Sequence, residues 1–139
     1  MTAPPPAPRV VAAVGGSVQR RIRAILPECE LHFVQTGAQL VRALDERQCD
    51  MLIIGMHFDE SSAVAALERV LSRKATFPVV CVRGRPFTQL GQPAFDALRM
   101  ALDALGAHNF IDLLQYPDDE AGNARIRTML ERLIPCQRC

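Results

Sequence analysis

The sequence predicts an α/β fold built on one open, doubly wound parallel sheet. Short apolar runs rich in Val, Ile and Leu alternate with amphipathic segments five times along the chain. Such an alternation requires parallel strands joined by helical crossovers of one hand. The 139 residues match the usual size of one domain and are too few for the eight βα units of a closed barrel. We therefore expect five strands, five helices and a single aliphatic core.

The first βα unit begins with the Val- and Ala-rich run 10–14. This strand ends at Gly15-Gly16-Ser17, a turn that leads into the N-cap of a helix. The helix is expected to stop at Pro27, which cannot continue it. Its two faces differ in character: the apolar face comprises Val18, Ile22, Ile25 and Leu26, and the basic face comprises Arg20, Arg21 and Arg23.

The second and third units have clear start signals. A strand at 31–34 is followed by Thr36 and Gln39, which form the capping-box pattern of a helix start. The uniformly apolar run 51–54 is typical of a central parallel strand that is covered on both faces. The inner helix faces are expected to be Leu40, Val41 and Leu44 in the second helix, and Val64, Leu67, Val70 and Leu71 in the third.

The last two units are separated by a long connection. A fourth strand is expected at 79–82, and the connection runs over 83–92 before a fourth helix. A fifth strand is expected at 110–114, and the helix after it is capped by Asp118 or Asp119. The apolar stripes are Phe95, Leu98, Leu102 and Leu105 in the fourth helix, and Ile126, Met129, Leu130 and Leu133 in the fifth.

The composition restricts the classes of function. Sixteen basic residues and 15 acidic ones give a net charge of +1, without the basic excess that direct nucleic-acid binding requires. All the basic residues except Lys74 are Arg, which indicates either a coding bias or planar recognition of anions. Five Cys, no export signal and no long apolar run predict a cytoplasmic protein that does not bind membranes. We expect a flexible Pro-rich lead-in at 1–8, one domain at 9–135 and a tail at 136–139.

Three segments resemble parts of the receiver domain of bacterial two-component response regulators, in that family's order. Residues 49–54 (CDMLII) resemble the third strand, residues 77–80 (FPVV) the approach to the fourth, and residues 106–111 (GAHNFI) the Gly-Ala signature that enters the fifth. The resemblance covers about residues 9 to 134. It implies a flavodoxin-like (CheY-like) sheet with strand order 2-1-3-4-5, helices on both faces and a role in signal transduction.

The positions that carry the family's chemistry are filled by other residues. Gly15 and Gly16 replace the acidic pair that holds Mg²⁺ after strand one, and the phosphoacceptor Asp position falls on Gly55. The Ser/Thr position after strand four falls on Arg83, and the Lys position near the end of strand five falls on Leu113. Mg²⁺ prefers oxygen ligands, and an aspartyl phosphate needs a carboxylate nucleophile. The resemblance therefore implies a degenerate pseudo-receiver with no catalytic residue, metal or cofactor.

The leading hypothesis is a phosphorylation-independent signalling module, not an enzyme, that acts by protein–protein interaction. The resemblance implies an interface made of the fourth helix, fifth strand and fifth helix, with Phe110 at the position of the switch aromatic. A homodimer through this face is one expected arrangement. The alternative is a sensor for a phosphate-bearing anion or nucleotide, bound by helix N–H groups and a guanidinium at Gly15, Gly16, Ser17 and Arg83.

Three other features have both a functional and a structural interpretation. Cys136 and Cys139 have the spacing of half a zinc site or a redox pair, but a second ligand pair is missing. His57 and Asp59 form a candidate acid–base pair that no nucleophile accompanies. The basic faces of the first and last helices are either ordinary solvated surfaces or docking sites for an acidic partner. On the last helix this face comprises Arg125, Arg127 and Arg132.

Overall fold

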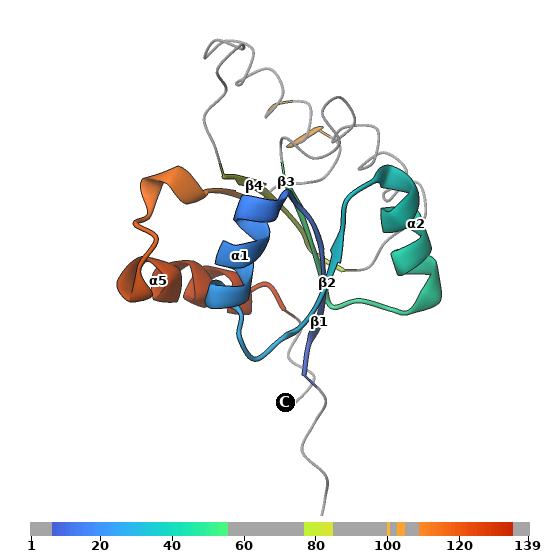
Figure 1. The fold of residues 1–139 in the computed structure, drawn as a ribbon, viewed down its shortest axis with the longest axis horizontal. Helices are drawn as coiled ribbons and strands as arrows, with labels where there is room; N and C mark the ends of the chain where they lie inside the picture. The colour runs from blue at the N-terminus through green and yellow to red at the C-terminus, as the bar shows by residue number, and fades with distance from the viewer. Residues whose placement is uncertain (1–6, 56–76, 85–99, 101–102, 105–108, 135–139) are drawn as a thin grey trace, which may run out of the picture.

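The structure is a computed structural model that describes residues 7–55, 77–84, 100, 103–104 and 109–134. Within these ranges five strands form one parallel sheet in the order β2-β1-β3-β4-β5 (Figure 1). The strands are β1 (Arg9–Ala13), β2 (Glu30–Val34), β3 (Met51–Gly55), β4 (Val79–Arg83) and β5 (Asn109–Asp112). The predicted fold class and strand order are therefore confirmed.

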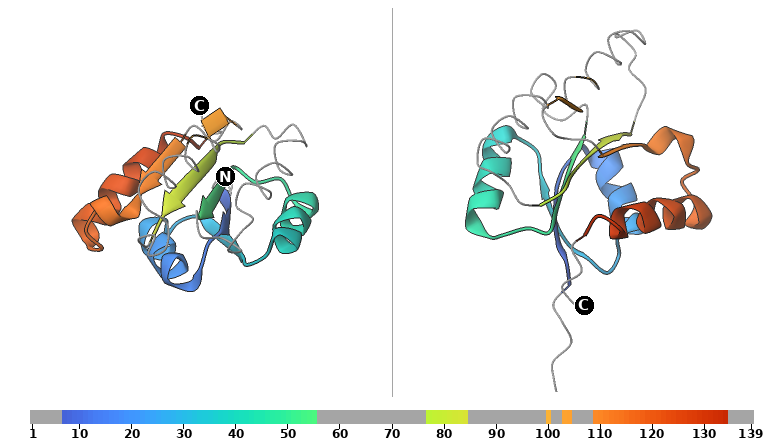
Figure 2. Two further views of the ribbon diagram at one scale, coloured as in Figure 1. Left: turned by 90° about the horizontal axis from the view of Figure 1, so that it is seen from above. Right: turned by 180° about the vertical axis from the view of Figure 1, so that it is seen from behind.

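The helices cover both faces of the sheet, as a doubly wound fold requires. Helices α1 (Gly16–Ile25) and α5 (Glu120–Glu131) pack side by side on one face, and α2 (Gly37–Glu46) covers the other (Figures 1 and 2). A short 3-10 helix, η1 (Leu113–Gln115), connects β5 to α5. This arrangement leaves the carboxyl ends of all five strands at one edge of the sheet.

The core is aliphatic, because the inward-facing strand residues are small or branched. Every residue of β1 and β3 is buried, as expected of central parallel strands. One cluster fills the space between the sheet and the α1 and α5 helices. It contains Val10, Ala12, Val14, Ile22, Ile25, Leu26, Met51, Ile53, Val80, Val82, Ile111, Leu113, Ile126 and Leu130.

Side-chain caps fix the starts of two helices where the sequence predicts them. Thr36 Oγ1 accepts a hydrogen bond from the Gln39 amide (3.1 Å), and Gln39 Oε1 accepts one from the Gln35 amide (2.8 Å). Asp119, rather than Asp118, caps α5 by accepting from the Gly122 amide (2.8 Å).

Two of the predicted helix faces need correction. In α2 the fully buried residues are Leu40 and Ala43, whereas Val41 and Leu44 are half-buried, so the buried stripe lies slightly to one side of its expected position. Arg21 of α1 is not part of a solvated basic face. Its side chain is only 11% exposed, because its guanidinium bonds to the β5–α5 connection.

Several expected features lie outside the described residues. They are the third and fourth helices, most of the connection 83–92, His57, Asp59, Cys136, Cys139, residues 1–6 of the lead-in and the tail at 136–139. The domain boundaries stay predictions.

Candidate functional site at the carboxyl edge of the sheet

The candidate site is built by the residues that end the parallel strands. In open α/β sheets, ligands bind at this edge because loops and helix starts converge there. Gly15 follows β1 after Val14, Gly55 ends β3, Arg83 ends β4 and Asp112 ends β5. The strand register places Gly55 opposite Val82, and Arg83 opposite Asp112. Gly15, Gly55 and Arg83 are expected from the sequence to end or follow strands, and the structure places them at this edge.

Gly15 and Gly16 leave open space at the start of α1. A Cβ atom added to either residue would have no other atom within 4 Å. Gly15 has an ordinary extended conformation, with φ of −74° and ψ of 170°, so its backbone does not demand glycine. Neither the space around Gly15 and Gly16 nor the backbone conformation of Gly15 would prevent a carboxylate side chain at these positions.

Gly55 is more closely surrounded but also has room for a side chain to start. A Cβ atom there would lie 3.4 Å from Val14 Cγ1 and 3.5 Å from the Ala13 carbonyl oxygen, which are ordinary contact distances. The residue itself is buried at the end of β3. The position that the resemblance assigns to the phosphoacceptor thus has room for a Cβ atom, and its glycine has no nucleophilic group.

A half-buried ion pair joins the ends of β4 and β5. Arg83 Nη1 lies 3.6 Å from Asp112 Oδ2, and the two side chains are 19% and 15% exposed. The other carboxylate oxygen, Oδ1, accepts a hydrogen bond from the Leu114 amide (3.0 Å) and caps η1. Both oxygens of Asp112 therefore have protein partners.

Asp112 is the residue at this edge that the sequence analysis missed. The fifth strand was expected to run to residue 114, which would bury Asp112 within it, but β5 ends at Asp112 and η1 follows. The available signal was the residue type, since Asp favours capping the backbone amide two residues later. A fifth strand over 110–114 predicts no acid at the strand ends, and this prediction is wrong at Asp112.

Two further positions that the resemblance singled out are apolar or aromatic. Leu113, at the family's Lys position, is 1% exposed within the core cluster. Phe110 is half-buried on β5 and pairs in register with Cys81 of β4. A buried leucine cannot supply the positive charge that a lysine would bring to an anionic group.

The residues of the anion-site alternative lie on two sides of the sheet edge. The α1 N-terminus has no side-chain cap at Gly15 and no acidic residue in its first turn, and Ser17 is exposed. Val82 faces the α1 side with the core cluster, and side chains alternate along a strand, so Arg83 points to the opposite face with Asp112. The alternative stays a prediction, but Arg83 already has an anionic neighbour.

The cysteines within the described residues are free thiols, and burial raises the pKa of each of them. Cys49 and Cys81 are buried and Cys29 is half-buried. Burial raises the pKa of the Cys81 thiol to about 12 and that of Cys49 to about 11.

Within the described part of the chain, His, Cys, Asp and Glu side chains form no group of three that could hold a metal ion. Asp50 lies at the opposite edge of the sheet, where its Oδ2 accepts from the Arg9 amide (2.8 Å).

This chain has the fold of response-regulator receiver domains. A response regulator from Hahella chejuensis superposes with a TM-score of 0.70 at 17% identity, covering 96% of this chain and 99% of that one. The chemotaxis protein CheY4 of Vibrio cholerae gives 0.67 at 11% identity, covering 94% and 100%. The receiver domain of the sensor histidine kinase PA1611 from Pseudomonas aeruginosa, which has a magnesium ion in its active-site cleft, gives 0.67 at 14% identity, covering 91% and 97%.

Comparisons at the level of sequence find no counterpart. No protein-family model and no curated protein matches the chain. Among the helices of the described residues, none combines the length and the apolar character needed to cross a bilayer.

Proposed function

We propose that this protein is a receiver-like signalling module that works without phosphorylation of an aspartate. The observation that carries the proposal is the chemistry of the carboxyl edge. Gly15, Gly16 and Gly55 occupy the positions aligned with the family's carboxylates, and the structure shows space there but no acid. The described residues have the receiver fold, and this alignment puts glycine where the family has the carboxylates that bind Mg²⁺ and accept the phosphoryl group.

Asp112 is a poor substitute for the missing nucleophile. Phosphoryl transfer to a carboxylate requires a free oxygen next to a bound metal ion. One oxygen of Asp112 lies beside Arg83 and the other accepts from the Leu114 amide. Attack by either oxygen would require giving up one of these interactions, and one carboxylate alone offers Mg²⁺ few ligands.

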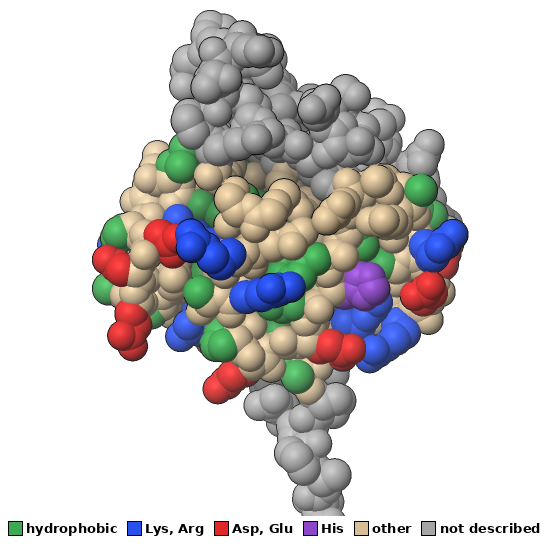
Figure 3. Space-filling view, in the orientation of Figure 1, with side chains coloured by type: hydrophobic (Ala, Val, Ile, Leu, Met, Phe, Trp, Pro, Cys, Tyr) green, Lys and Arg blue, Asp and Glu red, His purple; other side chains and the backbone are tan. Residues whose placement is uncertain are grey.

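The proposed mode of action is protein–protein contact in the cytoplasm rather than catalysis, nucleic-acid binding or membrane binding. On the described surface in Figure 3, acidic and basic side chains are interspersed. They do not form the continuous basic patch that binding to nucleic acid would favour. The described surface also has two exposed large apolar side chains, Met100 (72% exposed) and Leu114 (47% exposed). Leu114 lies between β5 and α5, the part of the proposed interface that the structure describes.

A homodimer through this face is supported by the distribution of charge along α5. Asp118, Asp119 and Glu120 lie at its start, the exposed Arg125 and Arg132 lie further along it, and the exposed Glu131 lies next to Arg132. A two-fold axis brings the same surface of two copies together in opposite directions. The acidic end of one α5 would then face the basic part of the other.

The phosphorylation test uses the wild-type protein with a small phosphodonor, with and without Mg²⁺, followed by intact-mass measurement at neutral pH. We expect no acid-stable or acid-labile phosphoryl adduct under either condition, while a phosphorylatable receiver domain treated in parallel gains one. A Mg²⁺-dependent adduct on the wild-type chain would refute the proposal.

The dimer is tested by light scattering over a range of protein concentrations. We expect wild type to dimerise and Leu114→Glu to shift toward monomer, because the charge would be buried in the apolar centre of the contact. Gln115→Glu is the matched control, since Gln115 is the exposed neighbour in η1. A wild-type protein that stays monomeric at the highest concentration would exclude this partner arrangement.

The second candidate is the phosphate-bearing ligand sensor. It is favoured by the α1 N-terminus, whose first N–H groups have no side-chain cap. Nucleotides and phosphorylated metabolites at millimolar concentration should then raise the melting temperature of wild type, and Arg83→Ala should reduce that rise. No shift with any ligand, or an identical shift in Arg83→Ala, would remove this candidate.

A further inference from the structure

Arg21 connects α1 to the segment between β5 and α5. Its Nη1 donates to the Leu113 carbonyl oxygen at 2.7 Å. Its Nη2 donates to the carbonyl oxygens of Tyr116 (2.8 Å) and Pro117 (3.0 Å), and its Nε donates to Asn123 Oδ1 (3.1 Å). One side chain thus holds η1, the turn after it and the first turns of α5.

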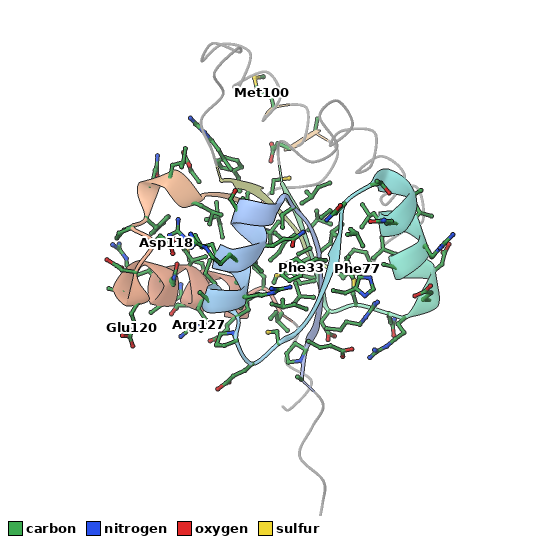
Figure 4. All side chains as sticks on the ribbon, viewed as in Figure 1. Phe33, Phe77, Met100, Asp118, Glu120 and Arg127 are labelled. Atoms are coloured by element: carbon green, nitrogen blue, oxygen red, sulfur yellow. The ribbon has the colours of Figure 1, made fainter. Side chains whose placement is uncertain are left out.

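Arg127 makes the same kind of connection in the opposite direction. It lies on α5 where this helix passes the C-terminal end of α1 (Figure 4). Its Nε donates to the Ile25 carbonyl oxygen (2.5 Å), and its Nη2 donates to that of Ala24 (3.2 Å). These carbonyls belong to the last turn of α1, where a cation also interacts favourably with the helix dipole.

The turn held by Arg21 packs closely against the start of α5. A Cβ atom on Gly122 would overlap the Pro117 carbonyl oxygen, which shows how near this turn lies to α5. The guanidinium also lies 3.8 Å from Asp118 Oδ1, so its charge has a counter-charge. Displacing the turn would leave a buried guanidinium and several carbonyls without their partners, which costs more than losing an exposed contact.

We propose that Arg21 and Arg127 make α1, η1 and α5 one rigid unit, the α1–α5 clamp. The face that β5 and α5 present is then formed in advance and is not created by a conformational switch. This inference rests on the proposed function, because it says how a module that is not phosphorylated keeps its docking surface ready. Binding is therefore governed by the availability of the partner.

The experiment measures amide hydrogen exchange by NMR in the full-length protein. The reporters are the amides of Leu114, Tyr116, Gly122 and Asn123, which bond within the clamped segment. We expect slow exchange in wild type and an increase of roughly tenfold or more in Arg21→Gln, since bonds to a charged donor are lost. The exchange rates of Arg21→Lys should lie between those of wild type and Arg21→Gln. An ammonium group keeps the charge but cannot donate to all the acceptors that the planar guanidinium reaches.

Arg20→Gln is the matched control, since Arg20 is the next residue on α1 and its side chain is 84% exposed. The reporter amides should exchange in Arg20→Gln at the same rates as in wild type. If Arg21→Gln does not fold, Arg127→Gln is read at the Leu26 amide, which bonds to the Ile22 carbonyl at the α1 end. Equal exchange in Arg127→Gln and wild type at that amide would overturn the clamp.

A second measurement separates this inference from the proposed function. Relaxation dispersion in wild type should show no millisecond exchange along β5, η1 and α5, and millisecond exchange there would refute a preformed face. If the phosphodonor test yields an adduct, the proposed function fails. The clamp is then tested by the same resonances in the adduct: unchanged chemical shifts along β5, η1 and α5 would support it, and changed shifts would overturn it.

Discussion

A single guanidinium can satisfy several carbonyl oxygens at once, and this chain uses that property at helix ends. Arg9 is 5% exposed and donates to the carbonyl oxygens of Arg47 (2.8 Å) and Ala43 (3.4 Å) at the end of α2. Arg127 does the same at the end of α1, and Arg21 at η1. The Arg-rich composition, which suggested coding bias or anion recognition, thus has a third explanation in helix capping.

The Arg83–Asp112 pair gives a prediction at this scale. Asp112→Asn removes the charge that faces the half-buried Arg83, and we expect a loss of about 1–3 kcal/mol in the free energy of unfolding. Urea denaturation measures this change. The control is Glu30→Gln, which breaks an exposed pair with Arg47 and should have little measurable effect. Equal effects of the two substitutions would show that the edge pair contributes no more than a surface contact.

The buried thiols predict a dependence of stability on alkaline pH. Burial raises the pKa of Cys81 from 9.0 to about 12, and unfolding restores the ordinary value. Above pH 9 the unfolded chain therefore releases a proton that the native chain keeps. The free energy of unfolding should fall as pH rises from about 9 toward 12, by at most about 1.4 kcal/mol per pH unit for this thiol.

Urea denaturation of wild type and Cys81→Ala across that pH range tests the assignment. The substitution lowers stability at every pH by leaving a small cavity, but it should also make the slope above pH 9 shallower. An unchanged slope would mean that Cys81 does not cause the dependence.

At the scale of elements, the starts of α1 and α5 show opposite requirements for glycine. Gly16 begins α1 with open space around it, whereas Gly122, in the first turn of α5, lies against the Pro117 carbonyl. The difference follows from the clamp, which brings the turn before α5 close to the helix itself. A larger residue would therefore fit at Gly16 of α1, whereas packing requires glycine at Gly122 of α5.

Gly122→Ala should lower the free energy of unfolding by about 1–3 kcal/mol, because a methyl group would overlap backbone that cannot move aside. Gly16→Ala is the matched substitution in open space, and it should leave stability unchanged or raise it by up to about 1 kcal/mol. Thermal and urea denaturation of both variants measure the contrast. A Gly122→Ala protein as stable as Gly16→Ala would show that the turn relaxes.

At the scale of the whole molecule, the described residues keep the five-stranded sheet of receiver domains with glycines at three of the strand ends and helix starts along its carboxyl edge. The receiver domain of PA1611, with magnesium in its cleft, covers nearly the same length of chain. In this chain the described core is aliphatic and draws on β1, β3, β4 and β5, with Leu31 and Phe33 of β2 packed against it. If the proposed alignment holds, this fold is stable without the carboxylates that the family's chemistry needs.

This independence predicts that metal binding can be restored. A triple variant with Gly15→Asp, Gly16→Asp and Gly55→Asp places carboxylates where space exists, and Mg²⁺ should raise its melting temperature. The control replaces the same three residues by Asn, which has nearly the same shape without the charge, and should respond much less. If Mg²⁺ stabilises neither triple variant, the alignment of these glycines with the family's acids is wrong.

The fold was predictable because its signals are local and repeated. Apolar runs, the Thr36 cap and the glycines that directly follow strands fix the order of elements and what stands at their ends. The role of Arg21 was not predictable, because its acceptors are backbone carbonyls 92 to 96 residues away, and every residue has a carbonyl. Asp112 was missed because one cap shortens a strand that otherwise continues in apolar residues.

The long separation between the two ends of the clamp matters during synthesis. Arg127 is 102 residues from Ile25, so α1 leaves the ribosome well before the helix that covers it. Until α5 emerges, Ile22 and Ile25 of α1 lack Ile126 and Leu130, their neighbours in the finished core. Until α5 is synthesised, the nascent chain therefore exposes apolar surface that the finished core buries, and exposed surface of this kind promotes aggregation.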